Sequence, residues 1–448
     1  MLLQKMQVKN FRCFEQAEWE FASQVNVLVG DNGAGKTAIL EAIAFGVGAL
    51  TGPLGEIYPR RPAGGKGIQI SAAELNARLV VYEKGGVPTR ESQFPVEVHI
   101  SGEVDSKTVK WGRVYDGNKN GHNLKEANAI KEIGTRMRSA IEEGQNVILP
   151  LIAYYGCRRL CPLESRFVRE LSFSGPGSQL LGYDDCLDAT INQRNFLEWF
   201  RRLEFAAMQR SEPFGVLEGV RRAITECTDD VTQIRFDSLE NELLLKFKDG
   251  RELPFRMLSD GYRNIVSLIA DIAYRAAILN PQFEAGAPQQ TPGVVLIDEI
   301  DLHLHPTWQR VIIGKMIAIF PCVQFFLTTH APLIIQSLEV SSQAKLINLN
   351  PGLSTEFRHK SPEEIYEDNQ GIEHIERSHR FRMMVDAASE YYRTLDQAKE
   401  ASPKHLEQLK RRLDELMLPF SDEPAYVAFL EMHREANPVL ARAFDAAR

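Results

Sequence analysis

The segment Gly30–Thr37 constrains the fold of this 448-residue chain more than any other feature. Its eight residues, GDNGAGKT, follow the apolar run Val25–Val29, and apolar residues at helical spacing come directly after it. A strand, a glycine-rich turn and a helix in this order are the context in which the pattern G-x-x-x-x-G-K-T binds phosphate. The sequence therefore predicts an α/β fold of the P-loop type. A chance match within an ordinary glycine turn is the alternative.

The residue types of this loop suit a nucleoside triphosphate. Glycines let backbone N–H groups curl around phosphate oxygens, and the N-terminus of the following helix adds partial positive charge. Lys36 is expected to reach the β- and γ-phosphates, and the Thr37 hydroxyl to bind Mg²⁺. We therefore predict ATP and Mg²⁺ as cofactors. The residues assigned to the nucleotide in this segment are Gly30, Asn32, Gly33, Ala34, Gly35, Lys36, Thr37 and Ala38.

A second apolar run, Val294–Ile297, ends in two carboxylates. In a P-loop enzyme such a pair holds Mg²⁺ and activates water. Asp298 is predicted to bind the metal together with Thr37, and Glu299 to polarise the attacking water. The alternative is an acidic strand end with no catalytic role.

Two more segments complete the predicted site. The run Val323–Leu327 ends in Thr-Thr-His, and we expect His330 to sense the γ-phosphate, although a lone His at a strand end is usually only a polar terminus. The segment LSDGYR precedes a helix with one apolar face. Ser259 would cap this helix, or Ser259, the Gly261 backbone and the helix N-terminus would form a second phosphate cradle.

In this order the P-loop, LSDGYR, VVLIDE and LTTH resemble the ATP-binding-cassette (ABC) superfamily, in its soluble SMC/RecF/Rad50-like branch. The opening segment Val8–Phe14, which contains Arg12, also resembles this branch, where it lies beside the nucleotide. The resemblance implies an ABC-type ATPase head, with a mixed sheet and an antiparallel β-subdomain. It also implies that Ser259 and Gly261 act in trans, so that two copies close head to tail over ATP.

The segments Asp301–Gln309 and Pro150–Gly156 make the chain similar to compact bacterial AAA-type ATPases of anti-phage systems. These include the ATPase subunits of Septu and of certain retrons, whose partner is an HNH nuclease. The similarity implies an ATP-hydrolysing switch that forms homodimers or higher homo-oligomers and controls a separate effector. One departure is His305, because transporters and Rad50-like proteins commonly have Asp six residues beyond the catalytic Glu.

A DNA-repair ATPase and a transporter subunit are two alternative functions. A RecF-like DNA-repair ATPase would use basic residues as a nucleic-acid track, although most such clusters are solvated surface or internal ion pairs. A transporter subunit is disfavoured by the missing Gln after Val147–Tyr154 and by the long C-terminal helical region. The basic residues considered are Arg60, Arg61, Lys66, Arg158, Arg159, Arg166 and Arg169.

The chain is expected to divide into four parts. Residues 1–159 would form a first ATPase lobe with the P-loop and the β-subdomain, and residues 160–257 a helical insertion and a β-meander. Residues 258–350 would form a second lobe with LSDGYR, the acidic pair and His330. Residues 351–448 would be helical, either a cap or a surface for docking a partner. The insertion is too short for a long coiled-coil arm.

The composition limits the class of protein and its expected cellular location. The chain is 44% hydrophobic and 25% charged, which excludes global disorder, and its net charge of −8 argues against a coat of nucleic acid. Six cysteines without a paired framework fit a reducing cytoplasm. The expected location is cytoplasmic, without a membrane-spanning helix. No Asp-x-Asp or His-Asn-His segment marks a nuclease beyond His330, so any cutting would belong to another subunit.

Overall fold

The computed structural model divides the chain into two compact units, Met1–Gly371 and Ile372–Arg448, which are described separately. It describes all residues except 55–76, 85–86, 118–121, 124, 160–178, 192, 238–241, 339–342, 351, 353–359, 363, 366–378, 399–402, 422–423 and 436–448. The basic residues Arg60, Arg61, Lys66, Arg166 and Arg169 therefore lie outside the described residues.

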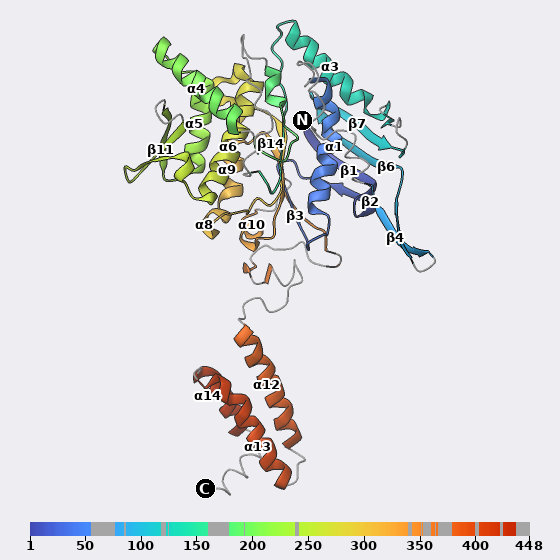
Figure 1. Ribbon diagram of the computed structural model, residues 1–448, viewed down its shortest axis with the longest axis vertical. Coiled ribbons are helices and arrows are strands. Elements are labelled where there is room, and N and C mark those ends of the chain that lie inside the picture. The colour runs from blue at the N-terminus through green and yellow to red at the C-terminus, as the bar shows by residue number, and fades with distance from the viewer. Residues whose placement is uncertain are drawn as a thin grey trace. The chain divides into compact units, whose positions relative to one another are not determined.

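A parallel sheet forms the centre of the first unit (Figure 1). Its order is β15 (Ala344–Asn348), β3 (Val25–Val29), β14 (Val323–Thr328), β13 (Gly293–Ile297) and β9 (Leu151–Tyr155). Strands β3, β9, β13 and β14 are buried along their whole length, which explains why their sequences are apolar runs rather than alternating patterns. All their carboxyl ends meet at one edge, where the predicted site residues follow.

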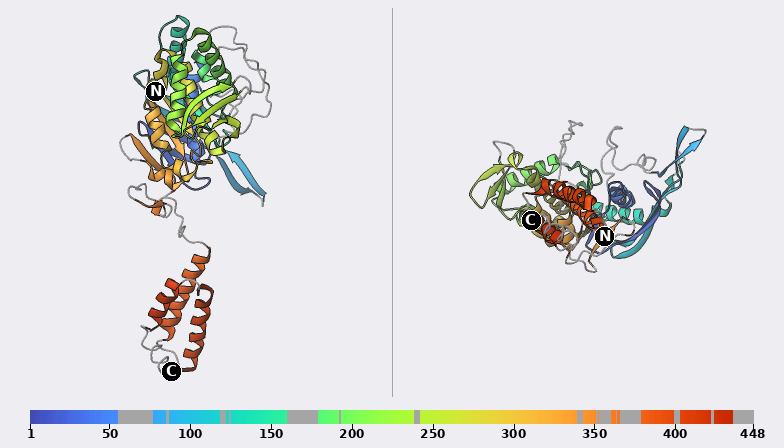
Figure 2. Two further views of the ribbon diagram at one scale, coloured as in Figure 1. Left: turned by 90° about the vertical axis from the view of Figure 1, so that its left-hand side faces the viewer. Right: turned by 90° about the horizontal axis from the view of Figure 1, so that it is seen from below.

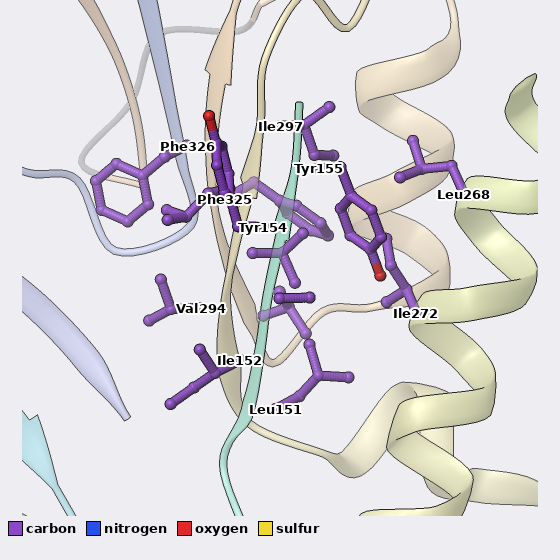
Figure 3. Close-up of a cluster of buried hydrophobic side chains, with 14 of the residues drawn as sticks. Leu151, Ile152, Tyr154, Tyr155, Leu268, Ile272, Val294, Ile297, Phe325 and Phe326 are labelled. Carbon is purple, nitrogen blue, oxygen red and sulfur yellow. The ribbon is translucent and has the colours of Figure 1, made fainter. Parts of the chain in front are cut away.

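Helices cover both faces of this sheet. The P-loop helix α1 (Lys36–Leu54) packs on one face, and α6 (Asp260–Leu279) packs on the other. Figure 3 shows Tyr155 of β9 pointing toward Leu268 and Ile272 of α6. The buried Tyr155 hydroxyl donates to Asp271 Oδ2 at 2.8 Å. The position of α6 is therefore fixed against β9 by both apolar packing and a hydrogen bond.

An antiparallel sheet lies beside the first. Its order is β2 (Phe14–Glu20), β1 (Leu2–Phe11), β6 (Val96–Val104), β7 (Lys107–Tyr115) and β8 (His122–Asn123). The buried Gln324 of β14 joins the two sheets, since its side chain accepts from the Leu3 N–H at 2.7 Å and donates to the Leu3 carbonyl at 2.8 Å. The predicted α/β fold with an antiparallel β-subdomain is confirmed, and the two strand directions occur in separate sheets.

Helix α1 lies between these sheets. Trp111 of β7 donates to the Gly46 carbonyl at 3.1 Å, and a Cβ on Gly46 would come within 2.2 Å of Ile100 Cδ1. Among the described helices, α1 alone is long and apolar enough to cross a membrane, and 67% of that stretch is buried inside the structure. Its apolar composition is therefore explained by burial against two sheets.

The remaining elements of the first unit follow the predicted order. After α3 (Asn128–Glu142) and β9 come helices α4 (Gln193–Arg210) and α5 (Gly215–Cys227), and then the predicted meander. The meander consists of β10 (Val231–Asp237), β11 (Glu242–Phe247) and β12 (Glu252–Pro254). A separate hairpin of β4 (Leu79–Lys84) and β5 (Val87–Ser92) projects from the antiparallel part (Figure 2). Short elements complete this unit: η1 (Lys125–Ala127), η2 (Gln179–Tyr183), η3 (Phe255–Met257), η4 (Pro281–Gly286), α7 (Ala287–Gln290), α8 (Pro306–Gln309), α9 (Ile312–Ile319) and α10 (Pro332–Gln336).

The second unit contains α12 (His379–Ala398), α13 (Pro403–Met417), η5 (Leu418–Phe420) and α14 (Pro424–Glu435). Among its described side chains, Tyr391, Leu413 and Leu430 form a buried cluster, in which the Tyr391 hydroxyl donates to the Leu430 carbonyl at 3.3 Å. Helices α13 and α14 each begin at a proline, a residue that favours the first helical position. The functional boundaries of the four predicted parts stay predictions.

Candidate functional site

The glycine-rich loop has a backbone that only glycine adopts readily. Gly30, Gly33 and Gly35 have φ values of +152°, +88° and +104°. A Cβ on Gly35 would lie 2.4 Å from Phe14 Cζ and 2.7 Å from Cys13 Sγ. Gly35 is therefore required both by its conformation and by the β1–β2 turn that presses against it.

Lys36 lies at the centre of this loop. Its Nζ donates to the carbonyls of Gly30 at 2.7 Å and Asp31 at 2.9 Å. Burial lowers the pKa of Lys36, and nearby carboxylates, led by Asp298, partly oppose that shift. Asn350, which the sequence analysis did not identify, braces the same loop. Its side chain accepts from the Asp31 N–H at 2.9 Å and donates to Asp31 Oδ1 at 3.1 Å.

Thr37 and Asp298 come together although 261 positions separate them in the chain. The Thr37 hydroxyl donates to Asp298 Oδ2 at 2.9 Å. A hydroxyl and a carboxylate oxygen are hard ligands of the kind Mg²⁺ prefers, and Mg²⁺ at phosphate sites usually takes few protein ligands. The donor set therefore fits the predicted metal.

Thr328 connects the two acidic residues. Its hydroxyl donates to Asp298 Oδ1 at 2.5 Å and accepts from the Glu299 N–H at 2.7 Å. Glu299 has a left-handed backbone, with φ of +49°, and is half-buried. The sequence analysis missed Thr328. The available signal was a hydroxyl at the end of an otherwise apolar strand next to β13.

His330 follows β14 and joins this group. Burial lowers its pKa, the Lys36 charge lowers it further, and Asp301, Glu299 and Asp31 oppose the shift. The imidazole is therefore mainly neutral near pH 7. The neighbouring Thr329 donates to Asp301 and accepts from the Ala331 N–H, which fixes the turn that holds His330.

Arg12 lies in the turn between β1 and β2, with φ of +49°. It forms an ion pair with Glu41 of the P-loop helix α1. Burial raises the pKa of Glu41, and Arg12 opposes that shift. The β1–β2 turn is thus anchored to α1, next to the loop, where the family resemblance places it.

The structure does not bring Ser259 and Gly261 into this group. Ser259 is the exposed N-cap residue of α6, yet its side chain makes no capping hydrogen bond. Gly261 has a role in its own chain, because a Cβ there would lie 2.6 Å from the His303 carbonyl. Within the described part of the chain, no hydrogen bond joins residues 258–263 to residues 30–37.

Arg159 does not lie on a basic surface track, which was one of the two alternatives for the basic clusters. Its side chain is 1% exposed and lies behind the acidic pair. It donates to the carbonyls of Asp298 at 2.6 Å and Glu299 at 2.9 Å. Burial lowers its pKa to about 10, so it stays cationic at neutral pH. A nucleic-acid contact through Arg159 is therefore excluded.

His305, which stands where related ATPases commonly have Asp, caps a short helix. Its Nδ1 accepts from the Thr307 N–H at 3.3 Å at the start of α8. The neighbouring Trp308 packs edge-on against Tyr262 of the LSDGYR segment, with ring centroids 5.6 Å apart. The loop after Glu299 is thus in contact with the start of α6.

Comparison with known proteins identifies two matching domain families and several similar proteins. An AAA domain family matches residues 5–241, and a second AAA domain family, whose description also names the AbiEii toxin of Type IV TA systems, matches residues 166–336. The chain is 24% identical to the "Retron Vc95 probable ATPase" of Vibrio cholerae serotype O1 biovar El Tor over 396 residues, covering 77% of this chain and 73% of that protein. It is 23% identical to the Septu protein PtuA of Bacillus thuringiensis over 424 residues, covering 89% and 91%.

The structure also aligns with the SMC head domain from Thermotoga maritima. The TM-score is 0.40 at 14% identity, and the alignment covers 77% of this chain and 94% of that one. The fold assignment rests on the strand order and the site geometry described above rather than on this alignment.

Proposed function

This chain belongs to the AAA domain family and is an ATPase, and we propose that it is an ATP-driven molecular switch that controls a separate effector. The observation that carries the proposal is the position of Asp298, bonded to Thr37 of the P-loop and linked through Thr328 to Glu299. This arrangement supports the proposal, because the proposed general base Glu299 would then lie next to the proposed phosphate and metal site.

In the proposed mechanism the loop N–H groups and Lys36 bind the phosphates. Thr37 and Asp298 would hold Mg²⁺, which when bound supplies positive charge to the β- and γ-phosphate oxygens. A Glu299 carboxylate oxygen accepts a proton from the attacking water. Neutral His330 donates a hydrogen bond to the γ-phosphate and so orients it.

The proposed switch is a homodimer. Ser259 and Gly261 of one copy would close over ATP held by the P-loop of the other, which fits the exposure of Ser259 in a single chain. ATP would then contact both copies only in the closed state and would favour that state. Converting a 1:99 equilibrium into 99:1 requires ATP to bind the closed state about 5.5 kcal/mol more tightly than the open state.

We place this switch in bacterial defence because the chain is similar to a retron ATPase and to a Septu protein over most of its length. The proposed effector is a nuclease, with the HNH type as the specific candidate. The helical unit Ile372–Arg448 is the proposed docking surface. The RecF-like alternative loses Arg159 as a DNA contact, since this side chain is buried.

Affinity purification of the full chain from its own host tests the proposal. With ATP and with Glu299→Gln to slow hydrolysis, a second polypeptide with nuclease activity should co-elute, and its activity should differ between ATP-bound and ATP-free preparations. Lys36→Ala is the control that should not respond to ATP. Absence of any nuclease in both preparations would contradict the effector assignment.

A further inference from the structure

Arg159 and Asn264 connect the start of helix α6 to the turn that carries Glu299. Arg159 follows strand β9, and its side chain donates four hydrogen bonds inside the protein. Its Nη1 donates to the carbonyls of Gly156 at 3.2 Å and Asp298 at 2.6 Å, and its Nη2 to that of Glu299 at 2.9 Å. The Nε of Arg159 donates to Asn264 Oδ1 at 2.7 Å. None of the roles proposed above uses this connection.

Two of the three carbonyls that Arg159 binds, those of Asp298 and Glu299, belong to a turn that needs support. Glu299 has φ of +49°, a conformation that non-glycine residues rarely adopt. The neighbouring N–H groups are already used, since the Asp298 N–H donates to the Tyr155 carbonyl and the Glu299 N–H to Thr328. The planar guanidinium is well suited to hold two successive carbonyls at once, which a lysine ammonium cannot do with the same geometry.

Asn264 holds the other end of the same turn. While its Oδ1 accepts from Arg159, its Nδ2 donates to the Leu302 carbonyl at 2.6 Å. The adjacent Gly261 lies so close to the His303 carbonyl that a Cβ would come within 2.6 Å. The start of α6 therefore contacts one end of residues 298–303 directly, through Asn264, and the other end through Arg159. A movement of that helix would move the backbone of Glu299.

We propose that Arg159 is a positioning residue that, together with Asn264, makes the orientation of Glu299 depend on the position of helix α6. When α6 is set by a second copy bound across ATP, the Glu299 carboxylate is aligned for hydrolysis. This inference rests on the proposed function, in which Glu299 is the general base and the start of α6 meets the partner's ATP.

Arg159→Lys tests the inference while keeping the charge. Lysine cannot replace the two-carbonyl contact, so kcat should fall about 10- to 100-fold, the scale seen for residues that orient a functional ligand through hydrogen bonds. ATP affinity and KM should stay within about threefold, because Arg159 touches backbone carbonyls and not the P-loop. A wild-type kcat in a folded Arg159→Lys protein would overturn the inference.

Asn264→Asp provides a second variant of nearly identical size. Aspartate still accepts from Arg159 but cannot donate to the Leu302 carbonyl, so it breaks one end of the connection only. It should also lower kcat with little change in KM. Should Arg159→Lys fail to fold, a wild-type kcat for Asn264→Asp would overturn the proposal by itself.

Arg275→Lys is the matched control. Arg275 is also buried and on α6, and it donates to Asp271 and to the carbonyls of Gly182 and Asp184. It has no bond to the turn at residues 298–303. Its substitution should lower the midpoint of thermal unfolding while kcat of the folded protein stays unchanged. An equal loss of kcat in Arg275→Lys and Arg159→Lys would reduce the role of Arg159 to general stability.

A double-mutant comparison separates this inference from the proposed function. In single-turnover measurements, Arg159→Lys should have little further effect once Glu299→Gln is present, because both act through the same carboxylate. Independent, multiplying effects would overturn the inference alone. Unchanged hydrolysis in Glu299→Gln by itself would instead overturn the assignment of Glu299.

Discussion

At the residue scale, one hydroxyl sets the geometry of both acidic residues. Thr328 is fully buried, accepts from the Glu299 N–H and donates to Asp298. No spacing rule identifies such a residue, because its two partners directly follow the neighbouring strand β13. The carboxylates and the loop residues were predictable because each follows a recognisable apolar run. Arg159 was not, since a basic residue near other basic residues gives no sign that it is buried.

Thr328→Val should damage both stability and hydrolysis. Valine keeps the shape of threonine but leaves the Glu299 N–H and Asp298 Oδ1 without this partner, at about 1–3 kcal/mol for each buried group. Urea unfolding would measure the loss of stability, and steady-state assays the loss of kcat. Thr328→Ser, which keeps the hydroxyl, should retain most of the turnover. Equal behaviour of the two variants would contradict the bridging role.

Glu299→Gln should bind ATP normally and hydrolyse it at least about 100-fold more slowly, since the amide cannot accept the proton of the attacking water. Binding of a fluorescent ATP analogue and phosphate release would be measured on the same preparation. Glu299→Asp is a useful comparison, because it keeps a carboxylate but shortens the side chain by one methylene group. Turnover close to wild type in Glu299→Gln would remove this residue from the mechanism.

At the scale of elements, the order of strands and helices was predictable and their lateral contacts were not. Local patterns located β3, β13, β14 and α6, because apolar runs and turn signals act over a few residues. The bonds of Gln324 to Leu3 and of Asn350 to Asp31 span more than 300 positions. Such pairs depend on which strands become neighbours, and a single sequence carries no local signal for that.

We predict that the start of helix α6 in one copy completes the ATP site of the other copy. Ser259→Arg should disable the exposed end of α6, and Lys36→Ala should disable the P-loop. Each variant alone should hydrolyse ATP poorly. When the two are mixed, a dimer containing one of each has one site with an intact P-loop and an intact α6 from the other copy, so turnover should return.

The controls for this mixing experiment follow from the structure. Ser259→Ala should cost less stability than the usual 0.5–2 kcal/mol of an N-cap substitution, because the Ser259 side chain makes no capping bond. It should therefore show whether Ser259→Arg acts through bulk and charge rather than through unfolding. If the mixture stays as inactive as its components while both still bind and associate, the start of α6 does not act in trans.

At the scale of the whole molecule, the chain consists of an ATPase unit and a separate helical unit. The first has a large continuous core, whereas the described side chains of the second form a buried cluster of Tyr391, Leu413 and Leu430. The helical unit is the proposed docking surface for an effector.

Light scattering on Glu299→Gln tests most directly whether ATP joins two copies of this chain. In the presence of ATP and Mg²⁺ the measured mass should rise to at least twice the mass of one chain, 50.6 kDa, and should return on ATP removal. Lys36→Ala should show no such change. A Glu299→Gln protein that binds ATP but keeps the same mass with and without it would contradict the account.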